Sequence, residues 1–125
     1  MDLSLEHNGD YLHVRRVSER SVTVVDRELE RSFLLTPDRA IEGWPVTDAS
    51  TLDAAHIDAI LELQPELVLL GTGTRQVFPA PAFMAGFLRK GIGIEVMDNA
   101  AAARTYDLLA GEGRHVVAAF ILPPA

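Results

Sequence analysis

The chain has 125 residues, of which 48% are hydrophobic and none is cysteine. This length and composition are typical of one globular domain with its own core, and they exclude extensive disorder, disulfides and thiolate chemistry. The formal net charge is −7, and basic residues form only isolated pairs such as Arg15-Arg16, so binding to nucleic-acid phosphates or to an anionic membrane is disfavoured.

The N-terminal residues Met1–His7 lack the basic and apolar regions of a signal peptide. No apolar run approaches the roughly 20 residues of a membrane-spanning helix. We therefore expect a cytoplasmic protein without a membrane span, in which residues 1–125 form one domain and residues 1–9 a loose N-terminus.

The first third of the chain has the pattern of β-strands. Tyr11–Val17 alternates, with Leu12 and Val14 on one face, and Ser21–Val25 is rich in β-branched residues. Glu30–Leu35 is a third predicted strand. Together these segments indicate a hairpin or meander, in which the acids Glu28 and Glu30 lie in a polar turn.

The next segment is predicted to be irregular and then helical. Ile41–Pro45 is expected to lack regular structure, with Trp44 as a lid on the core; an exposed Trp44 would instead indicate a protein interface. Ser50 and Asp53 resemble a capping box that starts a helix ending at Pro65. The apolar face of that helix is predicted to be Leu52, Ala55, Ala59, Ile60 and Leu63.

The remaining residues alternate between strands and helices. The predicted order is a strand at Glu66–Leu70, a helix from Pro81 to Gly91, a strand at Ile92–Met97, a helix from Asp98 or Asn99 to Gly111, and a strand at Arg114–Leu122. The apolar stripe of the first helix is Phe83, Met84, Phe87 and Leu88, and that of the second is Ala102, Thr105, Tyr106 and Leu109. The sequence therefore predicts a single α/β domain: a mixed central sheet with a βαβαβ C-terminal half, helices packed on it, and a β-rich N-terminal segment.

Two turns of this sheet are candidates for a binding site. Gly71, Thr72, Gly73, Thr74 and Arg75 follow the first of the parallel strands, and Asp98 and Asn99 follow the second. If these are neighbouring interior strands, both turns meet at the carboxyl edge, where ligands enter open α/β sheets. The dinucleotide and P-loop fingerprints both fail, because Gln76 stands at the sixth position and no Gly-Lys-Ser/Thr follows.

Each candidate also has a purely structural interpretation, and both interpretations stay open. The Gly-rich segment is either a turn leaving a strand or a contact for a small anion or partner. Asp98 or Asn99 is either a helix cap, worth about 1 kcal/mol, or a site residue as well. Arg104 lies off its helix's apolar stripe and is solvated or contacts a partner. Arg114 forms a surface ion pair with Glu112 or Asp107, or holds an anion.

The histidines give no sign of a metal site. His7, His13, His56 and His115 lack the spacing of a metal pair, and His56 is expected to be a semi-buried, hydrogen-bonded residue of its helix. No nucleophile elbow is present. We expect neither a metal nor a cofactor.

The second half of the chain resembles a known family. The carrying residues are Leu67–Gly73, Ile94–Asp98, Ala103–Leu109 and Glu112-Gly113-Arg114. They resemble the family of mitochondrial complex I assembly factor three and the adipogenesis-associated Mth-type domain proteins, many of whose bacterial members are domains of unknown function. The resemblance implies an α/β fold with a mixed sheet and a role in binding proteins, and it transfers no catalytic residue. Relatives often carry Thr, Cys and Asn at the positions of Asn99, Ala103 and Asp107.

Two functional hypotheses follow. The first is a non-catalytic, assembly-factor-like module that binds a protein partner or a second copy of itself. The alternative is a protein or enzyme that binds a small anion or nucleotide-type ligand in a crevice at Gly71–Arg75 and Asp98–Asn99. In that case Arg75 or Arg114 holds the anion and Asp98 acts as acid or base.

Overall fold

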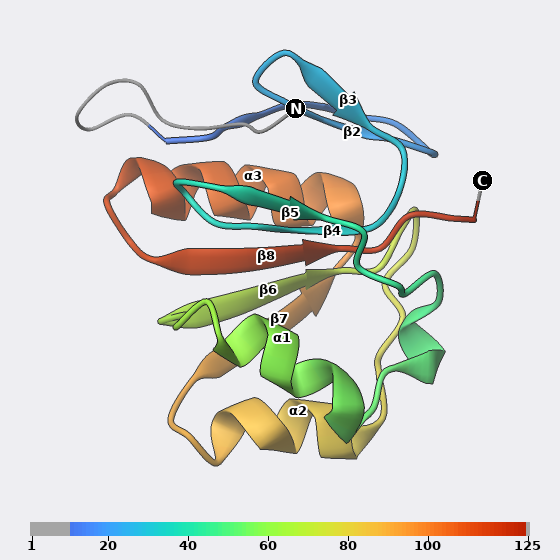
Figure 1. Cartoon of the computed structure of the whole chain (residues 1–125), viewed down its shortest axis with the longest axis vertical. Coiled ribbons are helices and arrows are strands. Elements are labelled where there is room, and N and C mark those ends of the chain that lie inside the picture. Colours follow the sequence, from blue (N-terminus) through green and yellow to red (C-terminus); the bar gives the residue numbers. More distant parts are fainter. Residues whose placement is uncertain (1–10, 125) are drawn as a thin grey trace.

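The computed structural model describes residues 11–124, which form two β-sheets and three α-helices (Figure 1). The larger sheet has the strand order β5-β4-β8-β6-β7, and the smaller one has the order β1-β2-β3. The larger sheet contains β4 (Phe33–Leu35), β5 (Ala40–Glu42), β6 (Leu67–Gly71), β7 (Gly93–Met97) and β8 (Val116–Phe120). The smaller contains β1 (Val14–Val17), β2 (Val22–Val24) and β3 (Arg27–Leu29). The helices are α1 (Ile57–Leu61), α2 (Pro81–Leu88) and α3 (Asn99–Gly111).

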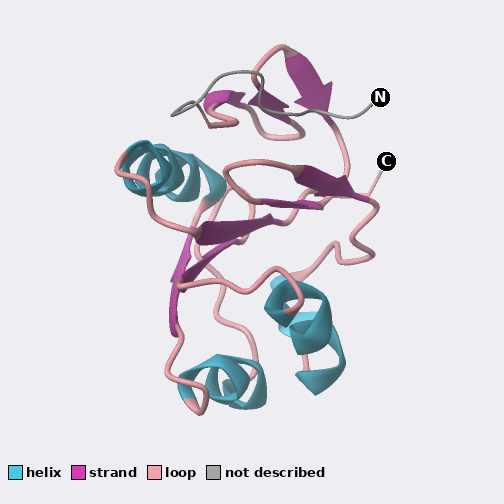
Figure 2. Cartoon of the chain, turned by 60° about the vertical axis from the view of Figure 1, so that its left-hand side comes forward, coloured by secondary structure: helices cyan, strands magenta, loops and turns pink. Residues whose placement is uncertain are grey.

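The five-stranded sheet is covered on both faces. Helices α1 and α2 lie on one face, whereas α3 and the three-stranded sheet lie on the other (Figures 1 and 2). Successive side chains of β8 point to opposite faces of the sheet. Ala118 and Phe120 pack in the core cluster of α3, whereas Val117 and Ala119 pack in the cluster of α1 and α2. Burial of both faces explains why β6 and β8 are nearly continuous apolar runs in the sequence.

The sheet is mixed, as predicted. Strand β6 pairs in parallel with both β7 and β8, whereas β4 pairs antiparallel with β5 and β8. One expectation is wrong: β7 is the last strand of the sheet and not an interior one. The side chain of Gln76 covers part of this edge, since its Nε2 donates a hydrogen bond to the Val96 carbonyl at 2.8 Å.

The N-terminal third contains two strands that the sequence pattern did not reveal. The strand predicted over Glu30–Leu35 is shorter than expected, since only Phe33–Leu35 forms β4. Glu28 lies on β3, which precedes that segment, and not in a turn; its carboxylate accepts a hydrogen bond from the Ser21 hydroxyl at 2.8 Å. The Ile41–Pro45 segment is not wholly irregular, since β5 pairs with β4. Trp44 is 7% exposed and belongs to the core. The expectation of a loose terminus at residues 1–9, and the one for His7, lie outside the described residues.

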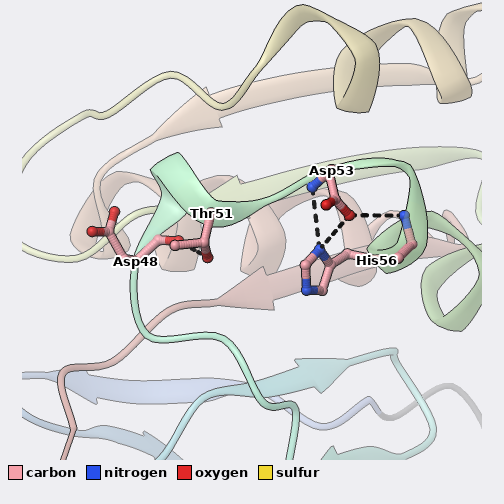
Figure 3. Close-up of polar contacts among 5 residues, drawn as sticks. Asp48, Thr51, Asp53 and His56 are labelled. Carbon is pink, nitrogen blue, oxygen red and sulfur yellow. Dashed lines mark hydrogen bonds and ion pairs between the residues drawn. The ribbon is translucent and has the colours of Figure 1, made fainter.

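The helix predicted from Ser50 begins later than expected. Two 3₁₀ turns, Ala49–Thr51 and Ala54–His56, precede α1, and Asp48 rather than Ser50 caps the first of them. Asp53 caps the second, and its N–H donates to His56 Nδ1 at 3.2 Å (Figure 3). This bond requires a neutral ring, so the 3.3 Å approach of Nδ1 to the Asp53 carboxylate is not an ion pair in that state. His56 is half-buried and hydrogen-bonded, as expected.

The breaks at Asp48 and Asp53 also change the buried face. Leu52 and Ile60 are buried as predicted, but Ala55 and Ala59 are exposed. A regular helix through this segment would place all four on one stripe. Two capped turns, each started by an aspartate that bonds its own backbone, rotate the alanines into solvent.

The two later helices follow their sequence signals closely. Pro81 is the first residue of α2, and Asp98 rather than Asn99 caps α3. Ala102 and Tyr106 of the predicted stripe are fully buried. Leu88 is the exception, since it is 59% exposed at the end of α2.

Candidate functional site

The turns that follow β6 and β7 lie side by side at the carboxyl edge of the sheet. The Thr72 N–H donates to the Met97 carbonyl at 3.0 Å, and the Asn99 N–H donates to the Gly73 carbonyl at 2.8 Å. These two bonds continue the parallel pairing of β6 with β7 beyond the strands themselves. The structure therefore brings Gly71–Arg75 and Asp98–Asn99 to one rim.

Asn99 fills the space where these turns meet. Its side chain is buried, with the residue 2% exposed. The Oδ1 atom accepts a hydrogen bond from the Gly73 N–H at 3.2 Å, and Nδ2 donates to the Ile121 carbonyl at 2.9 Å. A side chain at Gly71 would collide with Asn99 Oδ1, so the glycine makes this close approach possible. One amide thus joins the chain segments that leave β6, β7 and β8.

Asp98 and Thr72 are also engaged inside the protein. The Asp98 carboxylate accepts a hydrogen bond from the Ala101 N–H at 2.8 Å, which is the expected helix cap. The Thr72 hydroxyl donates to the Arg75 carbonyl and accepts from the Val77 N–H at 3.0 Å. Both side chains therefore hold the shape of the rim.

A surface hollow of about 250 Å³ lies beside the Gly-rich loop, but on the β8 side. It is lined by Thr72–Arg75, by Glu19 and Arg20 from the β1–β2 turn, and by Ile121–Pro123, together with Thr47 and Val77. Neither Asp98 nor Asn99 belongs to its lining, which corrects the predicted composition of the crevice. The sequence did not indicate Arg20, because only the tertiary fold brings its turn to this edge.

Arg114 lies at the opposite edge of the sheet. It precedes β8, and its Nε lies 3.4 Å from the carboxylate of Glu66, which precedes the parallel strand β6. The expected surface ion pair is therefore present, but with Glu66 rather than with Glu112 or Asp107. Arg114 cannot share an anion with Arg75, because the length of β6 separates them.

Arg104 lies on α3, away from the rim, and lines a different hollow of about 240 Å³. The other lining residues are Val14–Val17 of β1 and Ala100, Ala103 and Asp107 of α3. The Asp107 carboxylate accepts a hydrogen bond from the Val14 N–H at 2.9 Å. Burial raises the pKa of this carboxyl, whereas that hydrogen bond and the His13 charge act to lower it. The small residues of α3 at 100 and 103 were the only sequence signal for this hollow.

Between residues 11 and 124, no three His, Asp or Glu side chains are placed to hold a metal ion. His115 hydrogen-bonds through Nε2 to the Leu63 carbonyl at 2.7 Å, so it takes part in packing between β8 and the α1–β6 connection. No helix in the same range is both long and apolar enough to cross a bilayer.

Comparison with protein families gives a match over residues 14–121 to the family described as "Protein of unknown function (DUF498/DUF598)". Among curated proteins, the "13 kDa major membrane protein" of Francisella tularensis is 32% identical over 71% of this chain and 73% of its own length. The "NADH dehydrogenase [ubiquinone] 1 alpha subcomplex assembly factor 3" of Mus musculus is 27% identical over 90% of this chain. The chain spans 62% of that assembly factor's length.

Solved structures share the fold. An NMR structure of a Xanthomonas campestris protein is 47% identical, with a TM-score of 0.83, and the match covers 94% of this chain and 89% of that one. The solution structure of a Bordetella pertussis protein, described as a Mth938-like domain, is 27% identical, with a TM-score of 0.78, over 98% of this chain and 92% of that one. These comparisons confirm the resemblance drawn from the sequence motifs.

Proposed function

This chain belongs to the DUF498/DUF598 family of proteins of unknown function, and from that premise we propose that it is a non-catalytic, assembly-factor-like module that binds a protein partner. The relationship to the assembly factors supports the proposal. The observation that carries the proposal is that Asp98 and Asn99, at the carboxyl edge of the sheet, are hydrogen-bonded within the protein.

At that rim, a parallel sheet normally offers polar side chains to a ligand. Here the Asn99 amide bridges the Gly73 N–H and the Ile121 carbonyl, and Asp98 caps α3. An acid that caps a helix and a buried amide with both ends bonded are structural groups. Asp98 and Asn99 therefore stabilise the fold, and this favours the outer surface as the functional part of the molecule.

Within residues 11–124, that outer surface exposes three large apolar side chains. Phe78, Leu88 and Leu108 are 64%, 59% and 62% exposed. Burying such a side chain against a partner contributes roughly 1.5–3 kcal/mol. They lie in the β6–α2 loop, at the end of α2 and in α3, so each is a candidate contact for a partner.

The test is capture of the protein at native expression level, followed by cross-linking and mass spectrometry. We expect one defined partner above an untagged control, and we expect one of Phe78→Asp, Leu88→Asp or Leu108→Asp to abolish its capture. Ala82→Asp, which adds the same charge at an exposed position of α2, is the control. Recovery of nothing above background removes the proposal. Sedimentation of the purified chain distinguishes a second copy from a different partner.

A second candidate function rests on the hollow beside the Gly-rich loop. Arg75 is exposed there, and Arg20 reaches the same hollow while its Nη2 donates to the Pro124 carbonyl at 2.9 Å. Two guanidinium groups beside a Gly-rich turn are suited to a phosphate or carboxylate. The negative charge of Glu19, which lines the same hollow, disfavours binding of an anion.

A thermal-shift screen of phosphates, nucleotides and carboxylates tests this candidate. A ligand at a hundred times its Kd stabilises the fold by about 2.7 kcal/mol. The shift should disappear in Arg75→Ala and in Arg20→Ala, and it should persist in Arg89→Ala, directly after α2. The absence of a shift with every anion, or the same shift in all variants, excludes the anion site.

A further inference from the structure

The hollow between β1 and α3 has the shape of a groove for an extended chain. We call it the β1–α3 groove: Val14–Val17 on one side, and Ala100, Ala103, Arg104 and Asp107 on the other. The first side is the whole of strand β1, about 13 Å long at the rise of a β-strand. The second side is spaced i, i+3, i+4, i+7, which is one face of a helix.

Among residues 11–124, no segment pairs with strand β1 on the side of this groove. Within that range β1 is at the edge of its sheet and pairs only with β2. At Val14 the edge N–H donates to the Asp107 carboxylate, so a side chain stands where a neighbouring strand would otherwise bond. On the facing helix, Ala100 and Ala103 carry no side chain beyond Cβ, and this leaves room beside the strand.

The groove is positively charged on an acidic protein. Arg15, Arg16 and Arg104 all line it and all are exposed, although the chain has a net charge of −7. Arg15 donates through Nη1 to the Val25 carbonyl at 3.2 Å. Within residues 11–124, neither Arg16 nor Arg104 has an acid within ion-pair distance. Asp107, the one acid among the described lining residues, is engaged with Val14.

We propose that the β1–α3 groove binds an extended acidic segment of a partner protein, which adds to β1 as a further strand. Main-chain hydrogen bonds to β1 hold the segment, and its carboxylates point to solvent, where they pair with the exposed Arg15, Arg16 and Arg104. Alternate residues of an added strand point to opposite sides. The segment therefore carries small apolar residues toward Ala100 and Ala103, alternating with Asp or Glu. This inference rests on the proposed protein-binding function and adds, beside the exposed apolar side chains, a second contact surface for the partner and the chemistry of the segment that binds there.

The binding test uses short fluorescent peptides and the full chain. One peptide alternates glutamate with valine, a second has glutamine in place of each glutamate, and a third keeps the glutamates but has N-methylated backbone amides. We expect the first to bind, and we expect the other two to bind at least about fivefold more weakly, since each loses either the charges or the strand hydrogen bonds. Equal binding of all three overturns the proposal.

Variants locate the site. Arg104→Glu should weaken binding of the first peptide about fivefold or more, and Ala100→Trp should block the groove sterically. The controls Ala82→Trp on α2 and Arg89→Glu directly after it should bind like the parent. All four positions are exposed, so the fold is expected to survive, and circular dichroism checks this. Amide NMR shifts on titration should concentrate at Val14–Val17 and along α3. Shifts concentrated elsewhere, or loss of binding in the control variants, contradict the assignment.

The outcome separates this inference from the function on which it rests. If the chain dimerises through the groove in solution, with dimerisation lost in Ala100→Trp, the occupant is a second copy and the acidic-segment proposal is wrong. If peptide binding fails while partner capture at native level succeeds, the partner docks on another surface. If both fail, the protein-binding function itself is wrong.

Discussion

At the scale of single residues, Asn99 has the most consequential position. Its amide accepts from Gly73 and donates to Ile121 while being almost completely buried. A buried group left without its partner costs roughly 1–3 kcal/mol, and here two backbone groups depend on one side chain. Its contribution is therefore to hold the ends of three strands together.

We predict that Asn99→Leu lowers the free energy of unfolding by about 2–4 kcal/mol, because it leaves the Gly73 N–H and the Ile121 carbonyl without their hydrogen-bond partner. Urea denaturation followed by circular dichroism measures this. Gln76→Ala, which removes a hydrogen bond from an exposed side chain to the Val96 carbonyl, should cost less than about 1 kcal/mol. Equal costs in the two variants would contradict the role given to Asn99.

Asp107 leads to a prediction about pH. Burial raises the pKa of its carboxyl in the folded state, so between the ordinary and the raised value the folded protein binds more protons than the unfolded chain. This contribution to stability is present at low pH and is lost as the pH rises through the folded-state pKa. Asp107→Asn cannot ionise, yet its amide oxygen can still accept from Val14.

The stability gained in Asp107→Asn, relative to the parent, should therefore grow from acidic pH to neutrality. Urea denaturation across that range measures the difference. Asp26→Asn in the exposed β2–β3 turn corrects for the general effect of removing one negative charge from this acidic chain. A difference that shrinks as the pH rises would show that the carboxylate, rather than the acid, is favoured in the fold.

At the scale of elements, the end of α3 shows how a helix stop is built. Gly111 is the last residue of α3, as the sequence predicted. The residue with a positive φ, of 83°, is Gly113. Its N–H donates to the Ala110 carbonyl at 3.0 Å, and the Arg114 N–H donates to the Leu109 carbonyl at 3.1 Å. This is the paired bonding of a Schellman motif, in which glycine is favoured at the left-handed position.

The two glycines should therefore respond in opposite directions to alanine. Gly113→Ala should destabilise the protein by about 1 kcal/mol, because alanine is strained at this φ. Gly111→Ala should stabilise it by roughly 0.5–1 kcal/mol, since it lies in a helix and a new Cβ would meet Tyr11 at an ordinary 3.6 Å. Thermal unfolding of both variants measures this. If Gly111→Ala destabilises the protein and Gly113→Ala does not, the end of the helix depends on Gly111 and not on Gly113.

At the scale of the whole molecule, Tyr106 connects parts that are distant in the sequence. Its hydroxyl lies 2.7 Å from the Leu12 carbonyl and 3.0 Å from the Thr36 carbonyl, so α3 is joined to the segment before β1 and to the β4–β5 turn. Burial raises the pKa of this hydroxyl far above its ordinary value, and the group therefore stays a donor.

Tyr106→Phe should lower the free energy of unfolding by about 1–2 kcal/mol while unfolding remains a single transition, because the lost bond joins both layers of one cooperative unit. Tyr11→Phe is the control. The Tyr11 ring packs against Tyr106 with centroids 6.3 Å apart, but its hydroxyl has no hydrogen bond to any residue from 11 to 124. Denaturation curves that separate by probe in Tyr106→Phe would show that the layers unfold independently.

The sequence by itself determined the elements whose signals are local. Apolar runs bounded by glycine and proline located β6, β7 and β8, and Pro81 and Asp98 placed the starts of α2 and α3, because caps and periodicity act over a few residues. From two parallel strands it also followed that Gly71–Arg75 and Asp98–Asn99 meet at one edge.

Only the tertiary structure decided what those residues do there. The Asn99 amide turned inward because Ile121, which arrives from β8, offers a buried carbonyl that needs a donor. Likewise, β5 exists because β4 offers it an edge, and Arg15 and Arg104 face one groove because β1 packs along α3. Such pairings join residues far apart in the chain, and no local pattern encodes them.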